Sequence, residues 1–116
     1  MDDVVTVKGW TSVCYLEDIV PNTGVCALVD DEQVAVFRVG EQALYAIDNF
    51  DPNANAYVLS RGLIGSLGER VVVASPIYKQ HFDLRTGECL EAPEHSVRAW
   101  RVRLHEGRVL LGQPQG

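Results

Sequence analysis

The sequence predicts an all-β fold in a single domain, and three features of the chain support this expectation. Its apolar residues fall in short runs rich in valine and other β-branched types, which fit a pleated surface. Turn-forming residues separate these runs at intervals of roughly 8–12 residues, a spacing typical of a β-sandwich or barrel. The chain has 116 residues, 47% of them hydrophobic and 22% charged, which suits one domain with one modest core.

The first half of the chain predicts an antiparallel meander. The acidic turn Asp30-Asp31-Glu32 joins two apolar runs, and this arrangement favours a hairpin. A third run follows after a short turn, so three successive strands are expected to pair in order. The expected elements are a strand at residues 4–7, a helical turn at 15–19, and strands at 24–29, 33–39 and 43–47.

Residues 48–69 interrupt this pattern with turn formers and three glycines, and we expect a long loop with a short helical turn near residues 57–63. A loop of this length in a small β domain is usually functional. Further strands are expected at 70–74, 78–83, 89–91, 97–104 and 108–111. We therefore expect one domain over residues 1–112 and a flexible tail at 113–116.

Charge and targeting features narrow the functional classes. The net charge of −6 disfavours nucleic acid, whose phosphate backbone requires a basic surface. Ten acidic and two basic residues lie within residues 1–56, an asymmetry that suits a protein partner with a patterned surface or, equally, solvated loop charge. No apolar run approaches the roughly 20 residues that span a bilayer, and the acidic start Met1-Asp2-Asp3 is unlike a signal peptide. We expect a cytoplasmic protein without membrane contact.

The chain has three cysteines, Cys14, Cys26 and Cys89. An odd and sparse set in a chain without a signal peptide argues against a disulfide framework. We therefore expect reduced thiols, most of them buried as small hydrophobic residues.

Two proline loops lie on either side of the glycine-rich stretch: Asp51-Pro52-Asn53 and Ser75-Pro76-Ile77-Tyr78. Together with residues 24–29, 33–38, 58–62 and 74–82, they resemble the small subunit of the cytoplasmic NAD(P)H-dependent assimilatory nitrite reductase and, more broadly, a Rieske-type iron–sulfur domain. The resemblance covers residues 10–111, although the family often has an aromatic residue where this chain has Asn53. It implies a Rieske-like antiparallel β-sandwich or barrel of about eight or more short strands with two protruding loops.

The resemblance also indicates where a Rieske domain would bind its cluster. Two cysteines would stand at the positions of Asp51 and Ser75, and two histidines at those of Asn53 and Tyr78. Carboxylate, amide, hydroxyl and phenol groups are harder donors that do not hold iron–sulfur clusters. We therefore expect no [2Fe–2S] cluster, no metal and no cofactor on this chain.

Loops without a cluster must be held in another way, and we expect the four ligand-equivalent residues to form a hydrogen-bonded network. The alternative is that each is an ordinary exposed turn residue. Arg61, Lys79 and His81 flank the same loops, and they are candidates for a cationic rim that meets an acidic partner or, individually, for plain surface residues. His95 and His105 lack the spacing of a metal site and are expected at the surface.

Catalytic motifs are missing from the sequence: it has no nucleophile elbow, no phosphate-binding glycine loop and no paired-carboxylate motif. The resemblance implies an accessory, non-redox subunit that supports reduction of nitrite to ammonium in nitrate and nitrite assimilation. It also implies a large-subunit partner that carries FAD, siroheme and a [4Fe–4S] cluster. The alternatives are a Rieske-type ferredoxin electron carrier, a stand-alone binding module and a metal-binding oxygenase accessory protein.

Overall fold

The computed structural model describes residues 9–115, which form eleven strands and three short 3-10 helices. The strand expected at residues 4–7 lies outside the described part. The strands are β1 (Thr11–Tyr15), β2 (Thr23–Val29), β3 (Glu32–Val39), β4 (Ala43–Asp48), β5 (Phe50–Asp51), β6 (Ala56–Tyr57), β7 (Leu63–Leu67), β8 (Arg70–Ala74), β9 (His81–Asp83), β10 (Trp100–His105) and β11 (Arg108–Pro114). The helices are η1 (Leu16–Asp18), η2 (Leu59–Arg61) and η3 (Pro93–His95). The all-β prediction is confirmed.

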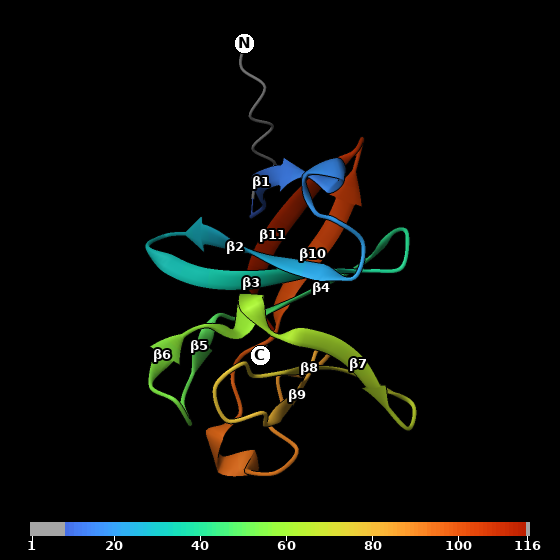
Figure 1. Cartoon of the computed structure of the whole chain (residues 1–116). Helices are drawn as coiled ribbons and strands as arrows, with labels where there is room; N and C mark the ends of the chain where they lie inside the picture. The colour runs from blue at the N-terminus through green and yellow to red at the C-terminus, as the bar shows by residue number, and fades with distance from the viewer. Residues whose placement is uncertain (1–8, 116) are drawn as a thin grey trace.

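The strands form three stacked sheets and a small two-stranded ribbon. Figure 1 shows the sheet β1-β11-β10 at the top, the meander β2-β3-β4 in the middle and the sheet β7-β8-β9 at the bottom, with the ribbon β5-β6 at the lower left. Every strand pair is antiparallel. No helix among residues 9–115 is long and apolar enough to cross a membrane.

The middle sheet is the predicted meander. The two-residue turn Asp30-Asp31 has φ angles of 51° and 66°, which suits the tight turns that join twisted strands. Both faces of β3 are buried: Ala35 and Phe37 face one core cluster, and Val34 and Val36 face the other. This double burial explains why β3 is almost continuously apolar in sequence.

The upper sheet joins the two ends of the described chain, because β1 pairs with β11, with Thr11 opposite Leu111. The expected tail was wrong for residues 113–115. Strand β11 continues to Pro114, and the backbone N–H of Gln115 donates to the Ala99 carbonyl at 2.7 Å. This extension passes a bulge opposite Trp100, where the strand register shifts.

The segment expected to be a long loop contains three strands, so that prediction was wrong for β5, β6 and β7. Only its helical turn was correct, as η2. Gly62 shows why small residues are needed here: a Cβ atom at this position would lie 2.3 Å from the Ala74 carbonyl oxygen on β8. Glycine therefore permits the close contact between β7 and β8.

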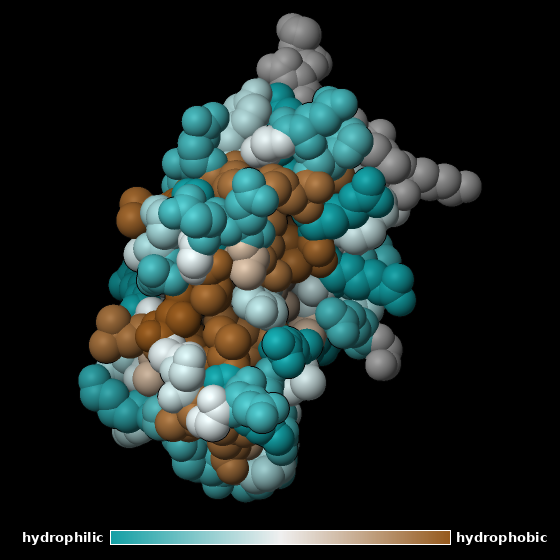
Figure 2. Space-filling view, turned by 90° about the vertical axis from the view of Figure 1, so that its right-hand side faces the viewer, coloured by the Kyte–Doolittle hydropathy of each residue, from teal (hydrophilic) through white to brown (hydrophobic). Residues whose placement is uncertain are grey.

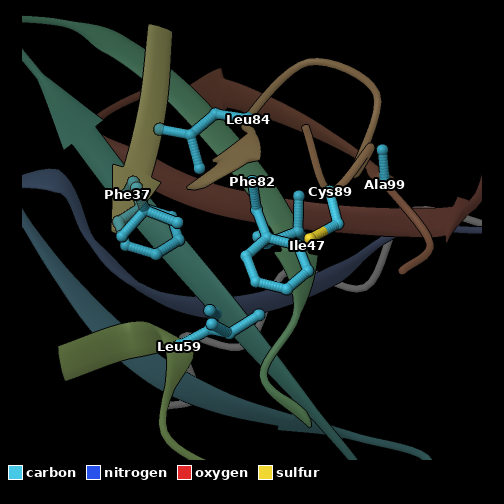
Figure 3. Close-up of a cluster of buried hydrophobic side chains, with 9 residues drawn as sticks. Phe37, Ile47, Leu59, Phe82, Leu84, Cys89 and Ala99 are labelled. Atoms are coloured by element: carbon cyan, nitrogen blue, oxygen red, sulfur yellow. The ribbon is translucent and has the colours of Figure 1, made fainter. Parts of the chain in front are cut away.

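The lower core cluster lies between the middle sheet and the sheet β7-β8-β9. Figure 3 shows Phe37, Ile47, Leu59 and Phe82 converging there, and all four are fully buried. The apolar residues at the margins of both clusters are only half buried. Figure 2 shows apolar side chains as a stripe down the side toward which the β7–β8 hairpin points.

The three cysteines differ in exposure, so the expectation that most of them are buried was wrong. Cys89 is buried beside Phe82, Cys14 is half buried, and Cys26 is exposed on the outer strand β2. Partial burial raises the pKa of the Cys14 and Cys26 thiols, which favours the protonated form.

Candidate functional site

The two proline loops meet through their first polar residues. Asp51 ends β5, and Ser75 follows directly after β8; both side chains have no exposed surface. The Ser75 hydroxyl donates a hydrogen bond of 2.5 Å to Asp51 Oδ2. This hydrogen bond joins the two loops directly through two side chains of the protein.

Each loop is also stabilised internally by hydrogen bonds of these same two residues. In the first loop, Asp51 Oδ1 accepts a hydrogen bond of 2.9 Å from the Asn53 backbone N–H, which forms an Asx turn. In the second loop, the Ser75 backbone N–H donates to the Gln80 carbonyl at 2.8 Å, and the Ser75 carbonyl accepts from the Lys79 N–H at 3.0 Å. Hydrogen bonds within the chain therefore hold both loops in place.

Asn53 extends the polar contacts toward η3. Its Oδ1 atom lies 2.5 Å from Nδ1 of His95, and its Nδ2 donates to the Cys89 sulfur at 3.7 Å. The expectation that His95 lies at the surface is correct, because its side chain is exposed, but its contact with Asn53 was missed. The two residues are 42 positions apart, so no local sequence signal could have indicated the pair.

Tyr78 does not join the network. Its side chain is 63% exposed, and within residues 9–115 its hydroxyl makes no hydrogen bond to another residue. Ile77, beside it, is also exposed. The predicted network therefore holds for three of the four ligand-equivalent positions, and the fourth presents an aromatic ring at the surface.

The predicted cationic rim is only partly formed. Arg61 and Lys79 line the same hollow of about 200 Å³, together with Ser75 and Pro76, and neither makes an ion pair with any residue in the described part of the chain. His81 behaves differently, because its Nδ1 lies 2.6 Å from a carboxylate oxygen of Glu91. The free positive charge beside the loops therefore comes from Arg61 and Lys79.

Glu91 is bound by both the backbone and the ring of His81. Its burial acts to raise its pKa, but the hydrogen bonds from the His81 backbone N–H, at 2.8 Å, and from the ring outweigh this. The pKa of the Glu91 carboxyl is consequently lowered, and its ionised form is stabilised beside His81.

The donor set at the loops does not fit a [2Fe–2S] cluster. Such a cluster needs thiolate sulfur and imidazole nitrogen, whereas the two cysteine-equivalent positions hold a carboxylate and a hydroxyl already bonded to each other. Among residues 9–115, no group of three or more His, Cys, Asp or Glu side chains is placed to hold a metal ion.

Comparison with known proteins agrees with this architecture. The family described as "Rieske-like [2Fe-2S] domain" matches residues 9–112, nearly the whole described chain. The chain belongs to this family. Within it, the chain is 46% identical over 103 residues to the protein of Escherichia coli K12 named nitrite reductase (NADH) small subunit, covering 88% of this chain and 95% of that protein. It is therefore a member of the nitrite reductase small-subunit group of Rieske-like domains.

A solved structure supports the same assignment. The solution structure of the nitrite reductase [NAD(P)H] small subunit from Erwinia carotovora superposes with a TM-score of 0.80 at 46% identity, over 95% of this chain and 85% of that one. A Rieske-like segment also occurs in the Klebsiella oxytoca protein named nitrite reductase [NAD(P)H] large subunit, where the chain is 42% identical over 108 residues. The chain spans 93% of its own length but only 11% of that protein's length in this match.

Proposed function

We propose that this chain is an accessory subunit of a cytoplasmic NAD(P)H nitrite reductase and carries no redox group of its own. The complex would reduce nitrite to ammonium during nitrate and nitrite assimilation. The FAD, siroheme and [4Fe–4S] groups needed to move electrons from NAD(P)H to nitrite would reside on the large subunit, because hydride and multi-electron chemistry requires cofactors.

The observation that carries this proposal is the buried hydrogen bond between Asp51 and Ser75. It occupies the two positions where a Rieske domain needs thiolates, and its donors are of the wrong chemical type for iron–sulfur binding. A ferredoxin would have to accept and release electrons at this point. The rigid loops instead suit recognition, since loops fixed on a β scaffold commonly form binding surfaces.

The proposed partner is the large subunit of the reductase. The Klebsiella oxytoca match supports this choice, because a domain like this one occurs there within a protein named as the large subunit. When two modules are joined in one chain in one organism, a contact between the separate modules in another is a natural expectation.

The docking surface that we propose includes the exposed tip of the second loop. Ile77 and Tyr78 are 46% and 63% exposed, and Lys79 and Arg61 add positive charge without a neutralising partner in residues 9–115. Aromatic residues and arginine are typical anchors of protein interfaces. His81 is a weaker candidate, because the Glu91 carboxylate offsets any positive charge on the His81 ring.

The test is co-expression of the tagged chain with the large subunit from the same source. We expect the two to co-purify, and we expect nitrite-dependent NAD(P)H oxidation to fall when the small chain is omitted. The purified small chain should be colourless, and a visible spectrum with iron–sulfur bands would overturn the non-redox proposal. A chain that neither binds the large subunit nor changes its rate would instead be a stand-alone binding module.

A paired variant experiment tests the docking surface. Tyr78→Ala combined with Lys79→Ala should weaken co-purification roughly tenfold or more, because aromatic anchors dominate interface energies. Arg85→Ala is the matched control, since Arg85 is also an exposed cation but lies beyond β9 and makes no ion pair in the described chain. Equal binding by the two variants would show that the large subunit docks elsewhere.

A further inference from the structure

Within residues 9–115, no strand pairs with the outer edge of β7. Strand β7 lies at one side of the sheet β7-β8-β9 and continues with β8 into a hairpin that projects from the body of the protein (Figure 1). From Gly62 to Gly68 the chain has no charge and no proline, the two devices that commonly prevent edge strands from pairing with other chains. Leu63 and Leu67, on the same face of the strand, are 78% and 43% exposed.

The hydrogen-bond pattern shows which backbone groups of β7 are free. The Val71 carbonyl on β8 accepts from the Leu84 N–H at 2.9 Å, on the side of β9. Because alternate residues of a strand direct their polar groups to opposite edges, Val72 faces β7, where it is opposite Gly65. The N–H and C=O groups of Ile64 and Ser66 therefore point outward, away from β8.

This edge is complementary to itself. If a second copy of β7 runs antiparallel with the two Gly65 residues opposite each other, each Ile64 lies opposite a Ser66 of the other copy. The outward N–H and C=O groups of that pair can then bond in both directions. Leu63 lies opposite Leu67 of the other copy, which gives two apolar cross-strand pairs on the exposed face.

Gly65 allows the two strands to approach at their centre. A Cβ atom at this position would have no heavy atom within 4 Å, so the face of the strand toward which a side chain would point is open there. Its two neighbours along the chain are the residues that offer the free backbone groups. No side chain of this chain therefore covers that face at the centre of the proposed pair within residues 9–115.

The charges beyond the ends of β7 match in the same register. Arg61 and Glu69 each lie four positions from Gly65, on opposite sides, and both are exposed. Neither makes an ion pair with a residue in the range 9–115. In the paired arrangement, Arg61 of one copy lies close to Glu69 of the other, just beyond one end of the paired strands. The same pair forms at the other end. Opposite charges in such positions favour pairing.

The outer strands β10, β1 and β2 lack this combination. β10 carries Arg101 and Arg103 along its length, and β1 has a register shift between Ser12 and Cys14 that interrupts its ladder. The strand β2 is uncharged, but η2 packs against it, and its far end leads into an acidic turn with no basic residue at the opposite end.

We propose that two copies of this chain associate through antiparallel pairing of their β7 strands, forming a six-stranded sheet across the two molecules. A symmetric interface of this kind needs only one self-complementary patch. The inference goes beyond the proposed function, because it concerns two copies of this chain, although Arg61 belongs to both proposed surfaces.

Sedimentation analysis of the full chain at about 1 to about 500 µM tests the proposal, over the range expected for a small interface. We expect a concentration-dependent monomer–dimer equilibrium. Ser66→Pro removes the outward N–H and leaves the β8 pairing unaffected, so the dimer dissociation constant should rise about tenfold or more, because the lost bond occurs twice. Ser66→Ala keeps the N–H and should dimerise like the wild type.

Charge reversal provides a second measurement that does not alter the backbone. Arg61→Glu and Glu69→Arg should each weaken the dimer, and the double variant should restore it, because the opposite charges are then exchanged. A wild-type chain that stays monomeric over the whole range overturns the proposal, as does equal behaviour of the proline and alanine variants. If the wild type is monomeric and Ser66→Pro loses only the large subunit, the β7 edge serves that partner and the dimer proposal is wrong.

Discussion

Removing the Ser75 hydroxyl should measure how strongly the two loops are held together. In Ser75→Ala, Asp51 keeps the hydrogen bond from the Asn53 N–H but loses the bond of 2.5 Å at Oδ2. Asp51 has no exposed surface, so water cannot replace the lost donor without a rearrangement. A hydrogen bond to a charged group contributes about 1.5–3 kcal/mol, and leaving one partner unsatisfied in the interior retains its full desolvation cost. We expect a loss of about 2–3 kcal/mol in the free energy of unfolding.

The assay is urea denaturation followed by tryptophan fluorescence. Trp100 is 4% exposed in the folded chain and should report global unfolding. The expected loss corresponds to a decrease of roughly 10 °C in Tm for a domain of this size. Ser66→Ala is the control, because this serine is exposed and its removal should change stability by less than about 0.5 kcal/mol.

A double-mutant cycle with Asp51→Ala isolates the pair. If the two side chains support each other, the combined variant should cost less than the sum of the single variants. A loss in Ser75→Ala no larger than in the control, or strictly additive effects, would refute the argument that this contact replaces cluster ligation in holding the loops.

Two further predictions concern close packing and pH. Gly62→Ala should lower the free energy of unfolding, measured by urea denaturation, by about 2–3 kcal/mol, because its Cβ would lie 2.3 Å from the Ala74 carbonyl oxygen. Gly65→Ala should be neutral or slightly stabilising, because the space around its Cβ is open. Equal effects of the two substitutions would contradict the packing argument. The lowered pKa of Glu91 stabilises the fold above its unfolded-state value of 4.5, and this contribution is lost as the pH falls through the lower folded pKa. Glu91→Gln should therefore be less stable than the wild type at neutral pH, and the difference should narrow below pH 4.5; a gap that is independent of pH would show that His81 does not stabilise the carboxylate.

The sequence predicted the parts of the fold that depend on local pattern. The hairpin around Asp30-Asp31 and the strand β8 have dense β-branched or apolar runs bounded by turns, so periodicity alone locates them. Strand β7 was missed because Gly62, Gly65 and Gly68 resemble loop residues. Its strand conformation is set by pairing with β8, a tertiary effect that overrides local propensity.

The sequence indicated which residues make up the candidate site, but not which of them contact one another. The resemblance indicated that Asp51 and Ser75 share one region, and general hydrogen-bonding rules indicated that they need partners. The sequence could not show that they bond directly, or that His95 contacts Asn53, because these contacts depend on how separate elements pack. Tyr78 was misassigned to the network for the same reason: its outward orientation is set by the path of the loop.

The bond between Asp51 and Ser75 also bears on how the protein matures in the cell. Loops held by a metal centre need that metal to reach their folded arrangement, whereas here both halves of the Asp51–Ser75 contact are encoded in the polypeptide. The contact between the loops therefore needs only the folding of the sheets that carry β5 and β8. If the chain carries no cluster, as proposed, the folding of its two loops does not depend on the delivery of iron.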